Sequence, residues 1–219
     1  MARSALVNNL IKRVRLLSFS LIAAGGIMLS GCATPPPPTS THDNICDIIQ
    51  HDPHWYHAAK KAQDKWGTSI PILKAFVYQE SRFIHNARPP REYAVGFIPL
   101  PRKSSAYGYA QAQDPAWEDY QKATGNRTGN RTNKYDALDF IGWYNSVSHQ
   151  RNGVALNDPY NLYLAYHEGH GGFSRKTYEQ KPWLKDVAVK VRNQAKRYES
   201  QLRNCKVPST RCFWPFCGD

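Results

Sequence analysis

The stretch FVYQESRF, residues 76–83, places a glutamate within the apolar side of an expected helix. Positions three, four and seven before Glu80, and three and four after it, share one helical face with it. All five are apolar: Leu73, Phe76, Val77, Phe83 and Ile84. Burial on such a face disfavours the charged carboxylate, so the pKa of Glu80 is expected to rise.

Two interpretations of Glu80 remain open on position alone. A glutamate whose pKa is about 6–7 is a good general acid near neutral pH, and such a shift costs on the order of 3 kcal/mol of stability. Alternatively, Glu80 lies at the edge of the face and pairs with Arg82, Arg88 or Arg91. The rest of the sequence must decide between them.

The length of 219 residues suits one domain with a substantial core, and the formal net charge is +12. Arg3, Lys12, Arg13 and Arg15 contribute four of these charges without any nearby acid, which leaves +8 on residues 16–219. A charge of this sign suits nucleic acid, an anionic membrane or an acidic polymer such as a cell wall. Charge alone does not choose among them.

The N-terminal segment indicates export. The basic residues precede LLSFSLIAAGGIML, residues 16–29, whose length is typical of a signal-peptide core and short for a membrane span. The following LSGC resembles the bacterial lipobox, which implies a signal peptide over 1–31 and a lipid on Cys32. Ala33 rather than aspartate after that cysteine resembles the sorting signal of outer-membrane lipoproteins, and this resemblance implies the periplasmic face of the outer membrane. No nucleic-acid partner is expected. An ordinary signal peptide followed by a chance cysteine is the alternative.

A linker and four further cysteines complete the expected organisation. Residues 32–44 are rich in Pro and Thr, which favours an extended tether. We expect a catalytic domain over 45–204 and a Cys-rich tail over 205–219. An even number of remaining cysteines in an exported protein suggests two disulfides, with three possible pairings. We favour Cys46–Cys205, clipping the domain's start to its end, and Cys212–Cys217; the spacing does not match a zinc site.

The rest of the sequence predicts a mainly α fold without a nucleotide-binding loop or an expected cofactor. Helical patterns or helix-start signals occur near residues 54–66, 69–80, 114–124, 136–148, 158–168 and 182–202. Residues 87–105 contain four prolines and predict a loop with a short hairpin. The tandem GNRTGNRTN, residues 125–133, predicts a basic surface loop without fixed structure.

Three short motifs occur in order: Glu80-Ser81, GYAQ at 108–111 and AYHEGHGGF at 165–173. Together they resemble the lysozyme-like lytic transglycosylases of bacterial cell walls, over roughly residues 50–200. The resemblance implies a single SLT-type domain in which Glu80 is the catalytic acid/base and Ser81 forms a hydrogen bond close by. It also implies that the cleft is lined by Gly108, Tyr109 and Gln111, and that Tyr166 points at Glu80.

The third motif departs from the family, which usually has asparagine where His167 stands. His167 and Glu168 are expected at the cleft as substrate-binding residues. Together with His170 they also suggest a metal site, but the spacing is HExH rather than HExxH, so no metal is expected. The aromatic residues Trp117, Trp143, Tyr144 and Tyr163 are candidates for stacking on sugars, although helical spacing favours the core.

The combined pattern predicts a peptidoglycan lytic transglycosylase with Glu80 as single acid/base, cleaving between N-acetylmuramic acid and N-acetylglucosamine to leave a 1,6-anhydro end. No second carboxylate stands out among Glu92, Asp114, Glu118 and Glu168, although Glu168 adjoins the expected cleft. Two alternatives remain open: a lysozyme-type hydrolase, and a non-catalytic wall-binding lipoprotein of a secretion or envelope complex. Peptidoglycan strands, the membrane and envelope or secretion proteins are the expected partners.

Overall fold

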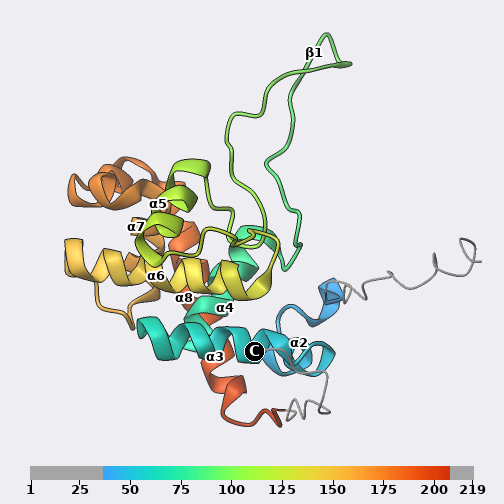
Figure 1. Cartoon of the computed structure of the whole chain (residues 1–219), viewed down its shortest axis with the longest axis vertical. Coiled ribbons are helices and arrows are strands. Elements are labelled where there is room, and N and C mark those ends of the chain that lie inside the picture. Colours follow the sequence, from blue (N-terminus) through green and yellow to red (C-terminus); the bar gives the residue numbers. More distant parts are fainter. Residues whose placement is uncertain (1–36, 208–219) are drawn as a thin grey trace, which may run out of the picture. The chain divides into compact units, whose positions relative to one another are not determined.

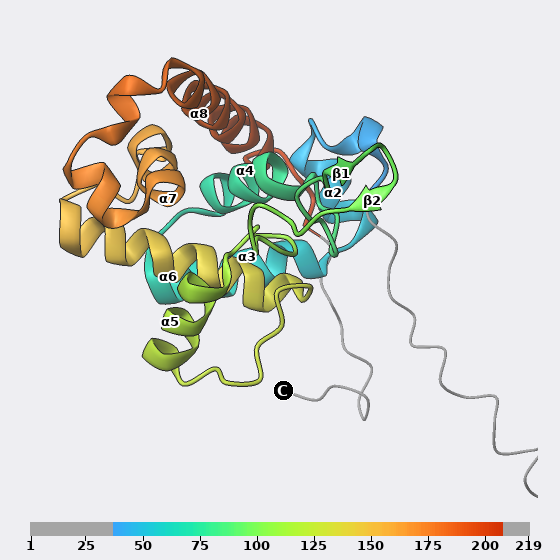
Figure 2. The ribbon, with the colours of Figure 1, turned by 90° about the horizontal axis from the view of Figure 1, so that it is seen from above.

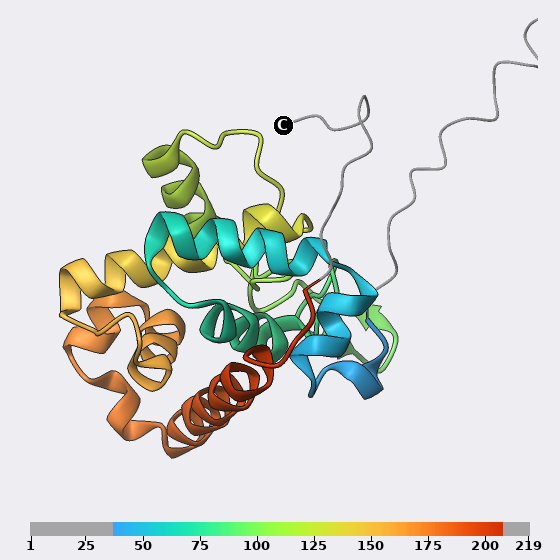
Figure 3. The ribbon, with the colours of Figure 1, turned by 90° about the horizontal axis from the view of Figure 1, so that it is seen from below.

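Helix α4 (Ile70–Ser81) is the central element of the structure, a computed structural model that describes residues 37–207. Every residue of α4 from Ile70 to Val77 is buried. A helix buried on all sides must be surrounded by other elements. Helices α3 (His54–Trp66) and α6 (Lys134–Asn152) pack on one side of it and α8 (Pro182–Leu202) on the other (Figures 2 and 3).

The mainly α prediction is confirmed (Figure 1). Within residues 37–207, the remaining elements are three α-helices, two 3-10 turns and one short hairpin. They are α2 (Ile45–His51), α5 (Asp114–Thr124), α7 (Pro159–Ser174), η1 (Thr39–Thr41), η2 (Thr177–Gln180), β1 (Tyr93–Ala94) and β2 (Ile98–Pro99). Residues Pro36–Asp219 form a compact unit by themselves. No helix within 37–207 combines the length and apolar character that a bilayer crossing requires.

Local signals fix most helix ends. Gly67 ends α3 in the left-handed conformation, with a φ of 85°. Asp158 caps α7 by accepting hydrogen bonds from the backbone N–H groups of the second and third helical residues. One helix start differs from prediction: Asn133 caps α6, which begins at Lys134 rather than near residue 136.

The start of the described chain packs onto the domain, so the predicted tether is wrong for residues 37–44. His42 is buried, and the Tyr198 hydroxyl on α8 donates to its carbonyl oxygen. Next to it, a disulfide joins Cys46 on α2 to Cys205, with Cα atoms 5.3 Å apart, which is the pairing that sequence position favoured. Cys32, Cys212 and Cys217 lie outside the described residues.

The loop over 125–133 has defined contacts, contrary to the prediction of no fixed structure. Asp136 on α6 accepts hydrogen bonds from the Asn126 side chain and from the Asn130 backbone N–H. Arg131 donates to the Ala112 carbonyl oxygen and pairs with Asp114. The polar side chains of this loop hold it against neighbouring segments. Composition alone does not reveal these contacts.

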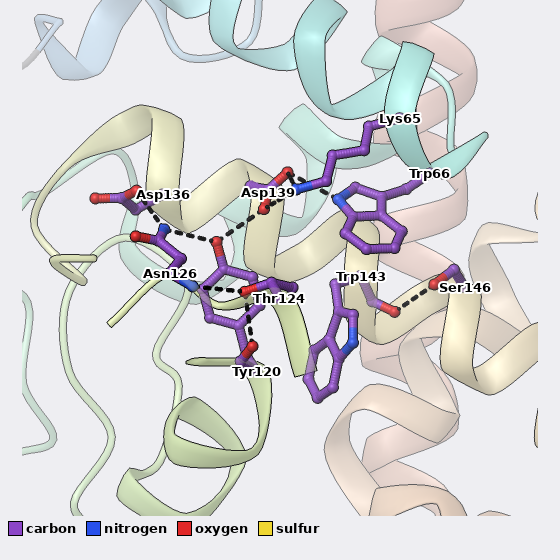
Figure 4. Close-up of polar contacts among 9 residues, drawn as sticks. All are labelled: Lys65, Trp66, Tyr120, Thr124, Asn126, Asp136, Asp139, Trp143 and Ser146. Atoms are coloured by element: carbon purple, nitrogen blue, oxygen red, sulfur yellow. Dashed lines mark hydrogen bonds and ion pairs between the residues drawn. The ribbon is translucent and has the colours of Figure 1, made fainter. Parts of the chain in front are cut away.

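Asp139 on α6 ties three helices together (Figure 4). Its carboxylate accepts hydrogen bonds from Lys65 and from the Trp66 indole N–H of α3, the latter at 2.8 Å. On the other side it accepts from the Tyr120 hydroxyl of α5, also at 2.8 Å. Because α5 packs mainly on α6, this carboxylate fixes α5 against the rest of the domain.

Replacing Asp139 should therefore destabilise the fold. The carboxylate is only 19% exposed, and hydrogen bonds to charged groups contribute about 1.5–3 kcal/mol. We expect Asp139→Ala to lower the free energy of unfolding by about 2–3 kcal/mol, measured by urea denaturation. Asp64→Ala is the matched control because Asp64 forms an exposed pair with Lys60, which is worth less than about 0.5 kcal/mol. Equal effects of the two substitutions would contradict this assignment.

Candidate active site

Glu80 lies in the last turn of α4, where the buried helix approaches the surface. Glu80 is partly exposed, whereas the residues of α4 from Ile70 to Val77 are buried. The hydroxyl of Tyr163 on α7 donates a hydrogen bond of 2.8 Å to its Oε1 atom. The carboxyl group is therefore oriented by a second helix rather than left to move freely.

Burial raises the pKa of Glu80 to about 7, although the hydrogen bond from Tyr163 acts in the opposite direction. The group is thus poised between its acid and its base form at neutral pH. Arg82 and Arg88 stack instead on the rings of Tyr78 and Tyr107. No ion pair joins Glu80 to a cation within residues 37–207, so the buried-acid interpretation describes this glutamate better than the edge interpretation.

Tyr166 is expected from the family resemblance to point at Glu80, but within residues 37–207 its hydroxyl forms no hydrogen bond to that carboxyl. Its hydroxyl donates to the backbone carbonyl oxygen of Ala110 at 2.6 Å. Burial is the main cause that raises the pKa of Tyr166, and the charge of Glu80 is the second. The Tyr166 hydroxyl and the Glu80 carboxyl are therefore still neighbours. Tyr163, which helical spacing assigned to the core, is both buried and the partner of Glu80. Tyr163 stands three residues before Tyr166, so both lie on one face of α7. That spacing was the sequence feature that could have indicated Tyr163 as a partner of Glu80.

A cavity of about 270 Å³ lies beside Tyr166, between the segment after the hairpin and helices α5, α6 and α7. Glu80 is outside its wall, but Tyr166 is in it and packs on Phe76, one turn before Glu80. Its main polar and aromatic lining residues are Gln111, Phe140, Tyr144, Tyr166, His167 and Glu168.

A wider groove of about 780 Å³ continues from this cavity and shares Ala116 and Tyr144 with it. Trp143 and His170 line this groove, and the His170 ring stacks on Tyr144 with centroids 4.4 Å apart. Together, the cavity and the groove suit an extended ligand better than a single small molecule. Trp117, by contrast, is a core residue.

Glu168 lines the cavity but its carboxylate is fully engaged. It accepts hydrogen bonds from Lys181 at 2.8 Å, from the Thr177 hydroxyl, and from His167 at 3.2 Å. Burial alone would raise the pKa of Glu168, but these three bonds outweigh it and lower the pKa to about 2. The side chain is only 3% exposed. Glu168 therefore serves as a structural anion, and His167 is held beside it and packs edge-on against Trp183.

The sequence profile of the transglycosylase SLT domain matches residues 20–205, which is most of the chain. The chain belongs to the transglycosylase SLT domain family. Its mainly helical fold is that of a lysozyme-like lytic transglycosylase domain, and membership implies peptidoglycan as the bound polymer. The match begins within the apolar run assigned above to the signal peptide. No individual curated protein matches the chain.

The GYAQ segment of this SLT domain is mainly structural. Gly108 has a φ of +78°, and a Cβ there would lie 2.1 Å from the Arg131 carbonyl oxygen, so only glycine fits. Tyr109 is buried against Trp55. Gln111 alone of these residues lines the cavity, and its amide donates to the carbonyl oxygens of Ala87 and Gly108. Gly108 and Tyr109 do not line this cavity, so their place in a substrate cleft stays a prediction.

Ser81 also differs from what the family resemblance implied. It is buried, and its hydroxyl donates to the Val77 carbonyl oxygen at 3.2 Å, one turn back on α4. No hydrogen bond between Ser81 and Glu80 is found in the described chain. Ser81 thus acts on Glu80 only through the helix end that both residues share.

Helix α7 of the SLT domain kinks at Gly169, whose φ of 73° and ψ of 158° are not helical. The helix predicted near residues 158–168 is longer than expected, because it resumes after the kink and continues to Ser174. The kink separates Glu168 from His170, whose ring nitrogen contacts the Ser148 hydroxyl. Across residues 37–207, no group of three His, Cys, Asp or Glu side chains is placed to hold a metal ion.

The raised pKa of Glu80 should make the free energy of unfolding depend on pH. From its ordinary value of 4.5 up to about 7, the folded state holds a proton that the unfolded state has lost. Stability should therefore fall as pH rises through this window and stay lowered above it. Glu80→Gln removes the effect, so we expect it to be about 1–3 kcal/mol more stable than the parent at pH 8, and about equal at pH 4.

Urea denaturation at both pH values measures this difference. Glu118→Gln is the control, because Glu118 is exposed and forms only an i,i+4 pair with Lys122. A stability gain in Glu80→Gln that is the same at pH 4 and pH 8 would show that titration of Glu80 is not its cause.

Proposed function

We propose that the protein is a peptidoglycan lytic transglycosylase that cleaves the β-1,4 bond between N-acetylmuramic acid and N-acetylglucosamine, with Glu80 as its single acid/base. The single observation that carries this proposal is the Glu80 carboxyl, which has a pKa of about 7 because of burial and is oriented by Tyr163. The groove that continues from the neighbouring cavity suits a polymeric substrate.

The reaction needs Glu80 in both protonation states. The protonated carboxyl donates its proton to the glycosidic oxygen as the bond from that oxygen to C1 breaks. The resulting carboxylate then accepts the proton of the muramic acid C6 hydroxyl, whose oxygen attacks C1 and closes the 1,6-anhydro ring. No water is consumed, and Glu80 ends the cycle protonated. A pKa near 7 suits both steps at neutral pH.

The surroundings of Glu80 favour this route over hydrolysis with two carboxylates. A retaining or inverting glycosidase places a second free carboxylate about 5–9.5 Å from the acid. Glu168 is the acid that lines the cavity, and it is occupied by Lys181 and Thr177. Asp114 is paired with Arg131. The substrate's own hydroxyl then supplies the nucleophile.

Replacing Glu80 should abolish cleavage. General acid–base catalysis contributes about 10²–10⁴-fold, so Glu80→Gln should lose at least about 100-fold in release of glycan fragments from purified walls. Mass spectrometry of the parent's products should show anhydro ends, lighter by one water than hydrolytic ends. Glu118→Gln is the matched control and should keep full activity. Full activity of Glu80→Gln would refute the proposal, and reducing-end muramic acid as main product would mean a lysozyme-type hydrolase.

Tyr163 should set the pH dependence of this reaction. Its hydrogen bond lowers the pKa of Glu80, so Tyr163→Phe should raise that pKa and move the loss of activity at alkaline pH to higher pH. Loss of orientation should also reduce the maximal rate roughly 10-fold. Tyr166→Phe is the control, because that hydroxyl bonds to the Ala110 carbonyl oxygen. An unmoved alkaline limb in Tyr163→Phe would contradict the assignment.

We also propose that the protein is lipidated on Cys32 and held at the periplasmic face of the outer membrane. The LSGC sequence after an apolar run of signal-peptide length supports this.

Cys32→Ala should release the protein from the membrane fraction into the soluble periplasmic fraction, measured by cell fractionation and immunoblotting. Cys205→Ser is a control that removes a cysteine elsewhere and should leave fractionation unchanged. A Cys32→Ala protein that stays with the membranes would place the anchor at another position.

A further inference from the structure

The hairpin of β1 and β2 carries an exposed apolar tip that neither the fold nor the cavity uses. Figure 1 shows its long stalk leading away from the helices. Val95 is 82% and Phe97 is 73% exposed, and three more large apolar side chains nearby are also exposed: Tyr93, Ile98 and Leu100. Elsewhere in residues 37–207, only Ile84 and Trp183 are exposed large hydrophobic residues. Concentrated exposure of this kind marks an interaction site.

The turn at the tip has a valine, Val95, at a position whose backbone conformation disfavours β-branched residues. Val95 and Gly96 both have positive φ, 51° and 81°, and the Phe97 N–H donates to the Ala94 carbonyl oxygen. Hairpin turns with two successive left-handed residues strongly favour Asn-Gly. A β-branched residue at positive φ is unusual. An asparagine would make a more stable turn, so the turn itself does not explain why a valine stands here.

Basic residues surround the stalk below the tip. Between residues 85 and 107 the cations are Arg88, Arg91, Arg102 and Lys103, against the single acid Glu92. Arg91 and Lys103 are exposed; Lys103 pairs with Glu92, so the segment keeps three cations in excess. Arg91 lies four residues before Val95, about 13 Å along an extended strand. This spacing places cations at the headgroup level when an apolar tip enters the outer part of a bilayer.

We propose that this hairpin inserts its tip into the surface of an anionic phospholipid membrane. Successive strand residues point to opposite faces, and Ile98 and Pro99 of β2 are both apolar and exposed. A protein groove recognises one face of a hairpin, whereas a lipid phase accommodates apolar side chains all round. The basic stalk then binds the anionic headgroups. Insertion stays shallow because the tip contains unpaired backbone groups.

This contact is distinct from glycan cleavage and from the proposed lipid. Lipidation of Cys32, if present, would hold Pro37 within about 18 Å of the membrane by covalent reach alone, which would favour the hairpin contact. The stalk is rooted beside the cavity, where the Ala87 carbonyl oxygen accepts from the Gly108 N–H and the Gln111 amide. Insertion of the tip would therefore orient the cavity relative to the membrane.

The test uses a chain without residues 1–32, so that neither the signal segment nor a lipid contributes. Its remaining residues contain the whole compact unit Pro36–Asp219. Sedimentation with vesicles of phosphatidylethanolamine and phosphatidylglycerol should show binding, with at least about 10-fold weaker binding to phosphatidylcholine vesicles. Raised salt should weaken the binding.

Two pairs of substitutions separate the apolar and the charged contributions. Val95→Asn with Phe97→Ser should reduce vesicle binding at least about 10-fold, while the asparagine suits the turn and the melting temperature does not fall. Arg91→Gln with Lys103→Gln should reduce it roughly 25-fold at low salt, at about fivefold per charge. The matched controls are Ile84→Ser for an exposed apolar residue and Lys190→Gln with Lys196→Gln for exposed cations on α8; both should bind like the parent.

Three results would overturn the proposal. They are no binding to anionic vesicles, binding that the tip pair does not change, and a dimer in sedimentation velocity that the tip pair dissociates, which would make a second copy the occupant. Wall cleavage by the tip variants, measured on purified peptidoglycan without lipid, should equal that of the parent. Because that readout is independent of vesicle binding, failure of the membrane proposal is distinguishable from failure of the proposed reaction.

Discussion

The hydrogen bond between Tyr163 and Glu80 joins the central helix to the helix that borders the cavity, and the proposed reaction depends on it. Helix α4 is buried almost throughout, so its last turn offers Glu80 little solvation. Burial raises the pKa of the carboxyl, and the tyrosine limits that rise while fixing the direction of the group. A fully solvated glutamate would be ionised at neutral pH and a poor acid. A glutamate without a partner would be costly to bury and free to rotate.

The same helix contains a second buried ionisable group, and its charge is disfavoured too. Lys74 is fully buried, its ammonium nitrogen lies 4.5 Å from the Trp55 ring centroid, and that nitrogen has no hydrogen-bond partner within residues 37–207. Burial lowers the pKa of Lys74 well below its usual range, although Asp52 acts in the opposite direction. Lys74 and Glu80 are six residues apart, about 9 Å along the axis. The central helix thus favours the neutral form of both groups, and both lower stability when charged.

Sequence periodicity was sufficient for six of the seven α-helices within residues 37–207, because each buries a continuous stripe and most have a local start or stop signal such as Gly67 or Asp158, but it missed the short helix α2. It was insufficient for contacts between distant segments. Tyr163 and Tyr166 look alike on one face of α7, and only the packing of α7 on its neighbours decides which hydroxyl reaches Glu80. The glycine of the GYAQ segment was visible, but its reason, the Arg131 backbone, comes from a loop that composition suggested was unstructured.

Glu168 shows how position near a cavity differs from participation in chemistry. Its carboxylate adjoins the cleft, yet Lys181, Thr177 and His167 satisfy it and hold its pKa at about 2. The next residue is Gly169, where α7 kinks. The bonds from Lys181 and Thr177 to Glu168 attach the segment before the kink to the chain that leads into α8. Replacing this anion would leave Lys181 without its partner and release the kinked segment that forms the cavity wall. Glu80 and Glu168 thus have opposite environments: the carboxyl of Glu80 is desolvated and poised to exchange a proton, and that of Glu168 is ionised and holds the cavity wall in place.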